Sequence, residues 1–419
     1  MNIKIAHLAN GLTIITQERP NLETVSLGVW VKTGSACENE NNNGISHFLE
    51  HMSFKGTNSR TALQITEEIE DLGGQSNAYT SRECTAYFAK MMKEDAEVAA
   101  DVLIDSVKNS TFPQEELVKE RDVVIQEIKQ TIDTPDDIVF DYFQETAFPS
   151  QALGRSILGP IEKVQNFGRE DLLKYINTNY AAENMVVCAV GNIKHDDFVN
   201  MITARMSDYK AKVSFTPDKQ VYKGGFCAIK RDIEQSHVLI GFKSCSYKDK
   251  LHCATVLLST ILGGGMSSRL FQEIREKRGL VYSVYSFNSM FSNNGLFGIY
   301  AGTEAKDVPS LMPVMIDEIK KVCNERITQK EFDRAKTQIK AGLKMGLESS
   351  SSTAEVLARQ MLMYGRTYSV AELVEKYEAV TLDDIRDTAV SIFTSTPTYT
   401  LLGNYKKYME YDELTKALA

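Results

Sequence analysis

Two histidines four positions apart, with a glutamate beside the second, are the residues of this 419-residue sequence best suited to chemistry. They form the segment His47-Phe48-Leu49-Glu50-His51. On a helix, side chains four apart lie on one face, so both imidazoles can bind one ion. Glu50 reaches the same side, in the inverse of the H-E-x-x-H order. The spacing predicts a zinc site with a general base, although two helical histidines also occur as surface or core residues.

A catalytic zinc ion takes three protein ligands and leaves a fourth position for water. The helix predicted over residues 114–132 offers Glu115, Glu116, Glu120 and Glu127. Glu120 and Glu127 are seven apart and share a helix face, where carboxylates are costly unless a cation or hydrogen bonds pair them. We therefore expect Glu127 to bind the ion and Glu120 to orient a ligand histidine from behind.

These parts predict peptide-bond hydrolysis with one Zn²⁺ per chain. Bound zinc lowers the pKa of its water toward ~7. Glu50 would take the proton of that water and pass it to the leaving amine. A further donor should stabilise the oxyanion.

The elements that must position these residues occur twice along the chain. Each half runs strand, helix, paired strands, amphipathic helix and long helix, on either side of a Pro- and Gly-containing stretch over residues 213–225. Mixed strands and hairpins favour an α+β fold over a doubly wound sheet. The expected organisation is a catalytic half over residues 1–212, a linker over 213–225 and a homologous half over 226–419.

Aligning the two halves places apolar residues opposite the metal-binding ones. Leu258, Ile261 and Leu262 stand opposite the three polar residues of the motif, and Gly342 stands opposite Glu127. We therefore expect the second half to keep the module without the metal.

Composition excludes several classes of protein. The net charge of −9 argues against non-specific nucleic-acid binding. No apolar run reaches the ~18 to 20 residues of a membrane helix, and the first 20 residues lack the features of a secretory signal. Seven scattered cysteines without a CxxC pair predict free thiols in a reducing compartment.

The stretch Gly44-Ile-Ser-His-Phe-Leu-Glu-His-Met-Ser-Phe-Lys-Gly-Thr57 resembles the signature of the pitrilysin-type metallopeptidases, the inverted zincins. Within that family the chain is most similar to the mitochondrial processing peptidase β subunits and their bacterial homologues, over essentially its whole length. The resemblance implies two α/β-roll-like halves that form a clam-shell around a chamber for short or unfolded peptides. It also implies zinc ligands at His47, His51 and Glu127, with Glu120 as the accessory glutamate.

The same resemblance suggests residues that contact the substrate. Asn77, Ala78 and Tyr79 match an edge strand that pairs with the substrate backbone. Without the family, an ordinary strand is the simpler interpretation. Tyr282 matches an oxyanion donor and Arg275 a group that holds the substrate backbone. A solvated basic turn is the alternative for Arg275, because Lys277 and Arg278 lie beside it.

Three further positions bear on cleavage preference. Asp137 and Asp141 match acidic positions that receive an arginine near the cleavage site, and four apart on a helix they form a clamp for one guanidinium. Phe54 matches an aromatic that lines the pocket on the other side of the cleaved bond. The alternatives are a helix-terminal charge effect for the aspartates and core packing for Phe54.

The resemblance leaves partner and location open. The related processing peptidase is a heterodimer whose second subunit has a long glycine-rich loop, and the nearest stretch here, residues 263–268, is short. We expect a homodimer or a homologous partner subunit, peptide substrates that are basic or contain arginine, and no membrane insertion. The expected location is a bacterial cytoplasm, with the mitochondrial matrix as the alternative. A non-catalytic structural, assembly or peptide-binding subunit of the same fold is the alternative function.

Overall fold

The structure is a computed structural model that describes residues 3–212, 217–325 and 327–419. Its described residues form two compact units. Unit 1 draws on the ranges Met1–Gln130, Ser156–Asp218 and Met345–Tyr368, and unit 2 on Thr131–Arg155, Lys219–Lys344 and Ser369–Ala419. Residues 213–216 of the expected linker lie outside the described residues. The expected half boundaries and the expected chamber stay predictions.

Unit 1 is built on a six-stranded sheet whose strands have the order β1-β2-β6-β3-β5-β4. Neighbouring strands are antiparallel except for the parallel pair β2–β6. The strand bounds are β1 Ile3–His7, β2 Thr13–Glu18, β3 Thr24–Val31, β4 Gln75–Thr80, β5 Thr85–Met92 and β6 Met185–Gly191. This order places β4 at an edge of the sheet.

Successive side chains of a strand point to opposite faces, and both faces of this sheet are covered. Leu27 and Val29 of β3 pack into the main core of unit 1 together with the helices α1 and α3, and we call this side the α1 face. Its helices are α1 Ile45–Ser53, α2 Ala62–Glu70, α3 Ala96–Lys108, α4 Gln114–Asp133, α6 Ile161–Val164, α7 Arg169–Asn179 and α8 His195–Met206.

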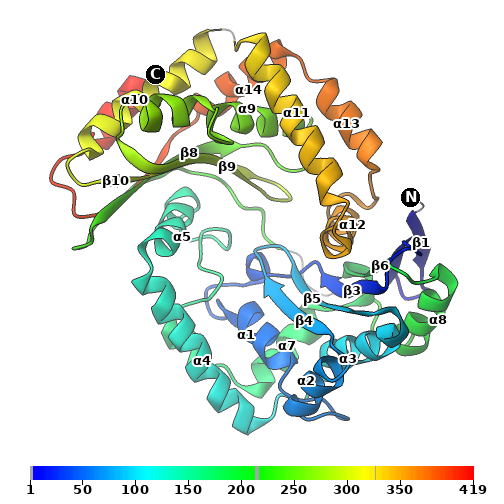
Figure 1. The fold of residues 1–419 in the computed structure, drawn as a ribbon. Coiled ribbons are helices and arrows are strands. Elements are labelled where there is room, and N and C mark those ends of the chain that lie inside the picture. The colour runs from blue at the N-terminus through cyan, green and yellow to red at the C-terminus, as the bar shows by residue number, and fades with distance from the viewer. Residues whose placement is uncertain (1–2, 213–216, 326) are drawn as a thin grey trace. The chain divides into compact units, whose positions relative to one another are not determined.

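The other side, which we call the α12 face, carries a helix from the second half of the chain. Leu357 and Met361 of α12, Ser350–Tyr364, pack on Trp30 and Cys188. The indole Nε1 of Trp30 donates a hydrogen bond of 2.6 Å to Glu355 Oε2. Figure 1 shows α12 beside β3 and β6, in agreement with their close contacts.

Unit 2 has a five-stranded sheet with the order β7-β11-β8-β10-β9. The strands are β7 Gly225–Lys230, β8 Gln235–Ser244, β9 Val281–Met290, β10 Gly295–Glu304 and β11 Thr398–Gly403. Its helices are α5 Pro135–Ala147, α9 His252–Gly263, α10 Val308–Asn324, α11 Gln329–Gly346, α13 Val370–Glu378, α14 Leu382–Phe393 and α15 Tyr411–Leu418. The core of this unit joins α9, α10 and α14 to one sheet face, and α5 packs on β11 and β7.

The two sheets share one pairing pattern. In each, a parallel pair (β2–β6 or β7–β11) is followed by three antiparallel neighbours, so that β3 corresponds to β8, β5 to β10 and β4 to β9. This pattern and the repeated order of elements confirm an α+β fold of two homologous modules. The helix after each long helix, α5 or α12, belongs to the unit built by the other half of the chain.

The structure also bears on two expectations from composition, which concern membrane helices and the cysteines. No helix in the described residues is long and apolar enough to cross a bilayer. The seven cysteines all lie in the described part of the chain and are free, three of them buried and four partly buried.

Candidate metal centre

Helix α1 carries the H-x-x-E-H motif and is anchored at its N-terminus by a buried carboxylate. Gly44 precedes the helix with a φ of 97°, where an added Cβ would lie 2.7 Å from the Leu158 carbonyl oxygen. The carboxylate of Glu38 accepts hydrogen bonds of 2.8 Å from the backbone N–H groups of Gly44 and Ser46 and one of 2.9 Å from Asn43 Nδ2. These bonds satisfy donors that a helix leaves open at its start. Glu38 therefore fixes where α1 begins.

The apolar side of α1 fixes how the helix is rotated. Phe48, Leu49 and Met52 are fully buried in the core of unit 1. This packing leaves His47 and His51 on another side, with ring centroids 4.6 Å apart. The predicted pairing of the two imidazoles on one helix face is confirmed.

Helix α4 brings a carboxylate to the two imidazoles. The Glu127 Oε2 atom lies 3.6 Å from His47 Nε2 and 3.5 Å from His51 Nε2. Among the described residues, these three form the group whose potential ligand atoms all lie within 4.8 Å of one another. Ligands at ~2.0 to 2.1 Å from a tetrahedral zinc ion are about 3.4 Å apart. The three side chains therefore fit a zinc ion between them.

Glu120 contacts one of these residues, His51, through the ring nitrogen that does not face Glu127. His51 Nδ1 is 3.0 Å from Glu120 Oε1, and Lys55 Nζ donates to Glu120 Oε2 at 2.8 Å. A proton on Nδ1 leaves the Nε2 atom of His51 free to bind an ion. The tertiary structure thus separates the acidic candidates of α4, because Glu115 is exposed and Glu116 pairs with Lys119.

Burial and neighbouring charge set the protonation of the group. Burial, with the adjacent His51, lowers the pKa of His47 to about 4. Burial would also lower the pKa of His51, but its bonds to Glu120 and Glu127 outweigh this effect and raise the pKa to about 9. The same hydrogen bond from His51 lowers the pKa of Glu127. At neutral pH His47 is therefore neutral and Glu127 is ionised, whereas His51 also carries a proton on Nε2, which a metal ion would displace on binding.

Glu50 lies beside this group with an unused carboxylate oxygen. Its Oε2 atom is buried and has no hydrogen-bond partner within the described residues. Burial raises the pKa of Glu50, and the Thr80 hydroxyl and His51 offset part of that rise. A carboxylate with a raised pKa and a free oxygen is suited to accept a proton from water and to return it.

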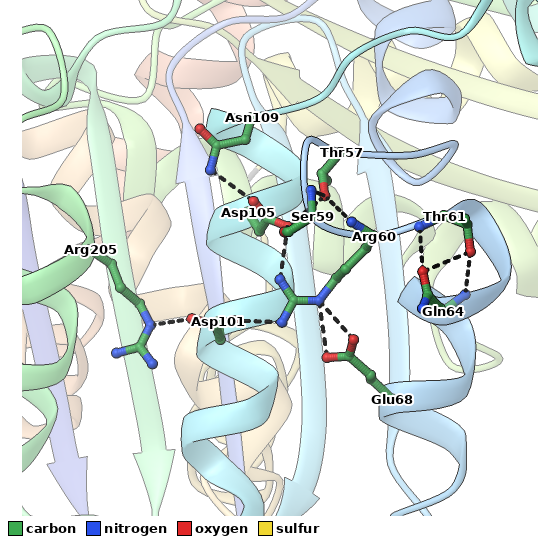
Figure 2. A network of polar contacts seen from close by, with 10 residues as sticks. All are labelled: Thr57, Ser59, Arg60, Thr61, Gln64, Glu68, Asp101, Asp105, Asn109 and Arg205. Atoms are coloured by element: carbon green, nitrogen blue, oxygen red, sulfur yellow. Dashed lines mark hydrogen bonds and ion pairs between the residues drawn. The ribbon is translucent and has the colours of Figure 1, made fainter.

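A polar network holds the segment that follows α1. The Arg60 guanidinium pairs with Glu68, Asp101 and Asp105, at 3.0, 2.6 and 2.8 Å. Thr57 Oγ1 donates to Asp105 at 2.6 Å, and this carboxylate belongs to α3 (Figure 2). The network ties the C-terminal side of the metal-binding helix to the core helix α3.

The predicted substrate residues of unit 1 lie at the sheet edge and at the end of α1. Asn77, Ala78 and Tyr79 belong to the edge strand β4, and the backbone N–H of Ala78 donates to the side chain of Asn77 at 2.8 Å. Phe54 ends α1 and packs against the core, 6.0 Å from the Tyr87 ring centroid. Core packing thus explains the partial burial of Phe54, and its role in a substrate pocket stays a prediction.

The remaining predicted residues belong to unit 2. The Arg275 guanidinium lies 5.7 Å from the ring centroid of Tyr282, whose side chain is 80% exposed. Asp137 and Asp141 lie on α5, as the four-residue spacing requires. Their roles toward the residues of unit 1 stay predictions.

Sequence reasoning missed three residues that shape this unit. Glu38 holds the start of α1, and Lys55 holds Glu120. Glu355 joins α12 to the sheet through Trp30. Lys55 follows the motif closely enough to have been considered as a partner of Glu120. The other two had no signal, because each contact joins segments whose proximity depends on the fold.

Comparison with known proteins agrees with this geometry. Residues 13–161 match the family described as Insulinase (Peptidase family M16), and residues 166–339 match the Peptidase M16 inactive domain. The solved protease from Helicobacter pylori is 25% identical, with a TM-score of 0.90 over 96% of this chain and 99% of that one. A Pseudomonas fluorescens structure at 19% identity and a TM-score of 0.89 shares the fold.

Curated relatives are similar over almost the whole chain. An uncharacterized zinc protease of Rickettsia felis is 39% identical over 406 residues, which cover 96% of this chain and 98% of the relative. The uncharacterized zinc protease YmxG of Bacillus subtilis is 37% identical, covering 92% and 94%. The human mitochondrial-processing peptidase subunit beta is 32% identical, covering 98% and 86%. The resemblance seen in the sequence is thereby confirmed, and the chain belongs to peptidase family M16, the insulinase family.

Proposed function

We propose that this protein is a zinc-dependent endopeptidase that hydrolyses short or unfolded peptides. The observation that carries the proposal is the group of His47, His51 and Glu127, spaced to hold one ion, beside a Glu50 carboxylate with a free oxygen. Two bacterial relatives are also named as zinc proteases.

Each side chain of the site has a distinct task. A zinc ion at this site would supply the Lewis acidity that activates a water molecule and polarises a peptide carbonyl. Glu50 accepts a proton from that water on its free oxygen and delivers it to the leaving amine. Glu120 keeps the Nδ1 proton on His51, and Lys55 keeps Glu120 in place.

The edge strand β4 supplies a surface for the substrate backbone. An extended peptide can add to an open sheet edge through main-chain hydrogen bonds. The Ala78 N–H donates to the neighbouring Asn77 side chain, which a substrate carbonyl can replace. On the α1 face, Thr80 at the end of β4 lies within reach of Glu50, so this edge leads toward the metal-binding residues. Tyr282 and Arg275 are the proposed oxyanion donor and substrate-backbone contact.

Zinc content and peptide cleavage together test the proposal. We expect the dialysed protein to retain about one zinc ion per chain and to cleave unfolded peptides. Glu50→Gln should keep the zinc and lose on the order of 10²- to 10⁴-fold in kcat. Glu115→Gln, an exposed position of the same helix as Glu120, is the matched control and should leave both readouts unchanged. Absence of zinc and of cleavage would instead favour the structural or assembly subunit.

Cleavage near arginine is the proposed preference. The two carboxylates of Asp137 and Asp141 suit one guanidinium. Asp137→Asn with Asp141→Asn should selectively depress cleavage of arginine-containing peptides, and an equal loss on peptides without arginine would contradict the clamp. A homodimer or homologous partner subunit, and a bacterial cytoplasmic location, stay predictions that gel filtration and cell fractionation would test.

A further inference from the structure

A pocket of about 610 Å³ lies on the α12 face, on the opposite side of the sheet from the metal-binding helix. It is lined by β4, β5 and β3 and by the first turns of α12, all within unit 1. Phe88 provides a partly exposed aromatic wall, the nearly fully buried Trp30 borders the pocket, and serines of β3 and α12 provide hydroxyl groups. The chemistry described above uses none of these groups.

The pocket is continuous with the proposed peptide-binding edge. Gln75, Ser76, Asn77 and Tyr79 of β4 line it, and Ala78 packs toward the core of the α1 face. A peptide paired with β4 has the same two-residue period as the strand it joins. Alternate side chains of that peptide therefore point toward the α1 face and toward this pocket.

The charges around the pocket are unequal. Glu355 is the carboxylate of the lining, and both of its oxygens are engaged, Oε1 by the Tyr79 hydroxyl at 2.5 Å and Oε2 by the Trp30 indole. Arg359 stands 3.7 Å from Glu355 Oε1 with half of its side chain exposed. Lys90 of β5 is exposed and makes no ion pair within the described residues. The lining therefore has two cations and one carboxylate, and that carboxylate accepts hydrogen bonds from two neutral donors and lies 3.7 Å from Arg359.

We propose that this pocket is a subsite for an acidic side chain of a peptide bound along β4. The inference rests on the proposed function, because it needs the substrate to lie on this edge. Lys90 and Arg359 pair with the carboxylate of the bound side chain, and the Phe88 ring contacts its methylene groups. With about 3.3 Å per residue, Asn77 lies roughly 10 Å along the strand from Thr80. The selected side chain therefore lies a few residues away from the cleaved bond.

The first experiment measures selectivity in cleavage. Paired fluorogenic peptides that differ only in glutamate against glutamine, moved one position at a time, are compared by kcat/KM. Glutamate should be favoured roughly fivefold at positions of one parity only, since two partly exposed ion pairs each contribute little. Arg359→Glu should reverse the preference toward lysine at the same position, and the exposed Lys90→Gln should weaken it. Lys194→Glu, an exposed residue outside the pocket, should keep the wild-type ratio.

The second experiment separates failure of the subsite from failure of the peptidase proposal. Trp30 is the sole tryptophan of the chain and lines the pocket, so its fluorescence reports occupancy. Glu50→Gln titrated with the same peptides should show tighter binding of the glutamate peptide, even if the wild type cleaves nothing. Cleavage without a parity-dependent preference, or a Trp30 signal that does not distinguish glutamate from glutamine, would overturn the subsite.

Discussion

Helices α1 and α9 follow equivalent strands in the two units but are built for different tasks. Helix α1 keeps two imidazoles and a carboxylate on one side, whereas Leu258, Ile261 and Leu262 of α9 are buried in the core of unit 2. Helix α11 has Gly342 where α4 has Glu127, and an added Cβ there would meet nothing within 4 Å. The module therefore folds without a metal, and the polar group of unit 1 is an addition that needs paired charges to offset its burial. The description of residues 166–339 as an inactive domain agrees with this difference.

Helices α1 and α9 also differ in how their N-termini are held. In unit 1 the buried Glu38 accepts the backbone N–H groups of Gly44 and Ser46. In unit 2 the residue before α9 is Leu251, which makes no side-chain cap. A helix that must aim ligands needs its N-terminus fixed, whereas a helix that only fills a core is positioned by its apolar contacts.

The largest expected effect comes from replacing His51 of α1 by leucine, the residue at the aligned position of α9. His51→Leu should abolish zinc retention after dialysis and lower peptide cleavage by at least about 10³-fold, because two ligands do not hold the ion. His252→Leu removes a histidine from α9 and is the control, which should leave zinc content unchanged. Zinc content by atomic absorption decides between them. Retention of a full equivalent of zinc by His51→Leu would break the comparison.

Removing the carboxylate that anchors α1 should have the next largest effect. Glu38→Ala leaves buried N–H donors without an acceptor, and we expect unit 1 to lose about 2 to 3 kcal/mol in its free energy of unfolding. Urea titration followed through Trp30 fluorescence measures this loss. Leu251→Ala, at the residue immediately before α9, should change that transition by less. An equal effect of the two substitutions would show that the cap has no special role.

Glu120→Gln tests the support behind the ligands. The amide still accepts a hydrogen bond from His51 but loses the charge that pairs with Lys55. We expect zinc affinity to fall by about 10-fold or more. Competition with a chelator gives the dissociation constant, and Glu115→Gln is the control on the same helix. An unchanged zinc affinity would contradict the supporting role.

The smallest expected effect concerns the ion pair between Arg269 and Glu331 near the start of the long helix α11. Against the opposing effect of burial, the Arg269 guanidinium and Thr328 lower the pKa of Glu331, near the start of α11, to about 2. A depressed pKa stabilises the folded state above the unfolded value of about 4.3, and this contribution is lost as pH falls toward 2. Glu331→Gln should therefore cost about 1 kcal/mol at pH 7 after screening by solvent, and its difference from wild type should shrink between pH 4.5 and pH 2.

Denaturant unfolding at pH 7 and pH 3 measures that difference. Glu116→Gln near the start of α4, whose partner is the exposed Lys119, should cost less at pH 7. A difference between Glu331→Gln and wild type that grows on acidification would contradict the linkage.

Much of the site followed from local patterns in the sequence. The four-residue spacing of His47 and His51 placed both on one helix face, and the seven-residue spacing of Glu120 and Glu127 did the same on α4. The repeated order of elements predicted the two modules, because strand and helix periods are properties of neighbouring residues.

Other contacts had no local signal. The anchoring of α1 by Glu38 depends on how the segment before the helix folds back on it, and the pairing of Lys55 with Glu120 depends on the packing of α4 on α1. Helix α5 belongs to unit 2 and α12 to unit 1, although each follows a long helix of the other half of the chain. The sequence does not indicate which sheet each helix covers, because both sheets offer an apolar face.

By itself, then, the sequence determined the ligand types, their spacing along each helix, the duplicated module and the family. The tertiary structure alone decided that Glu38 anchors α1, that Lys55 pairs with Glu120, and that the α12 face has a pocket with Lys90 and Arg359. The reason is physical, since spacing along one element is set by backbone geometry, whereas contacts between distant segments depend on how whole faces pack.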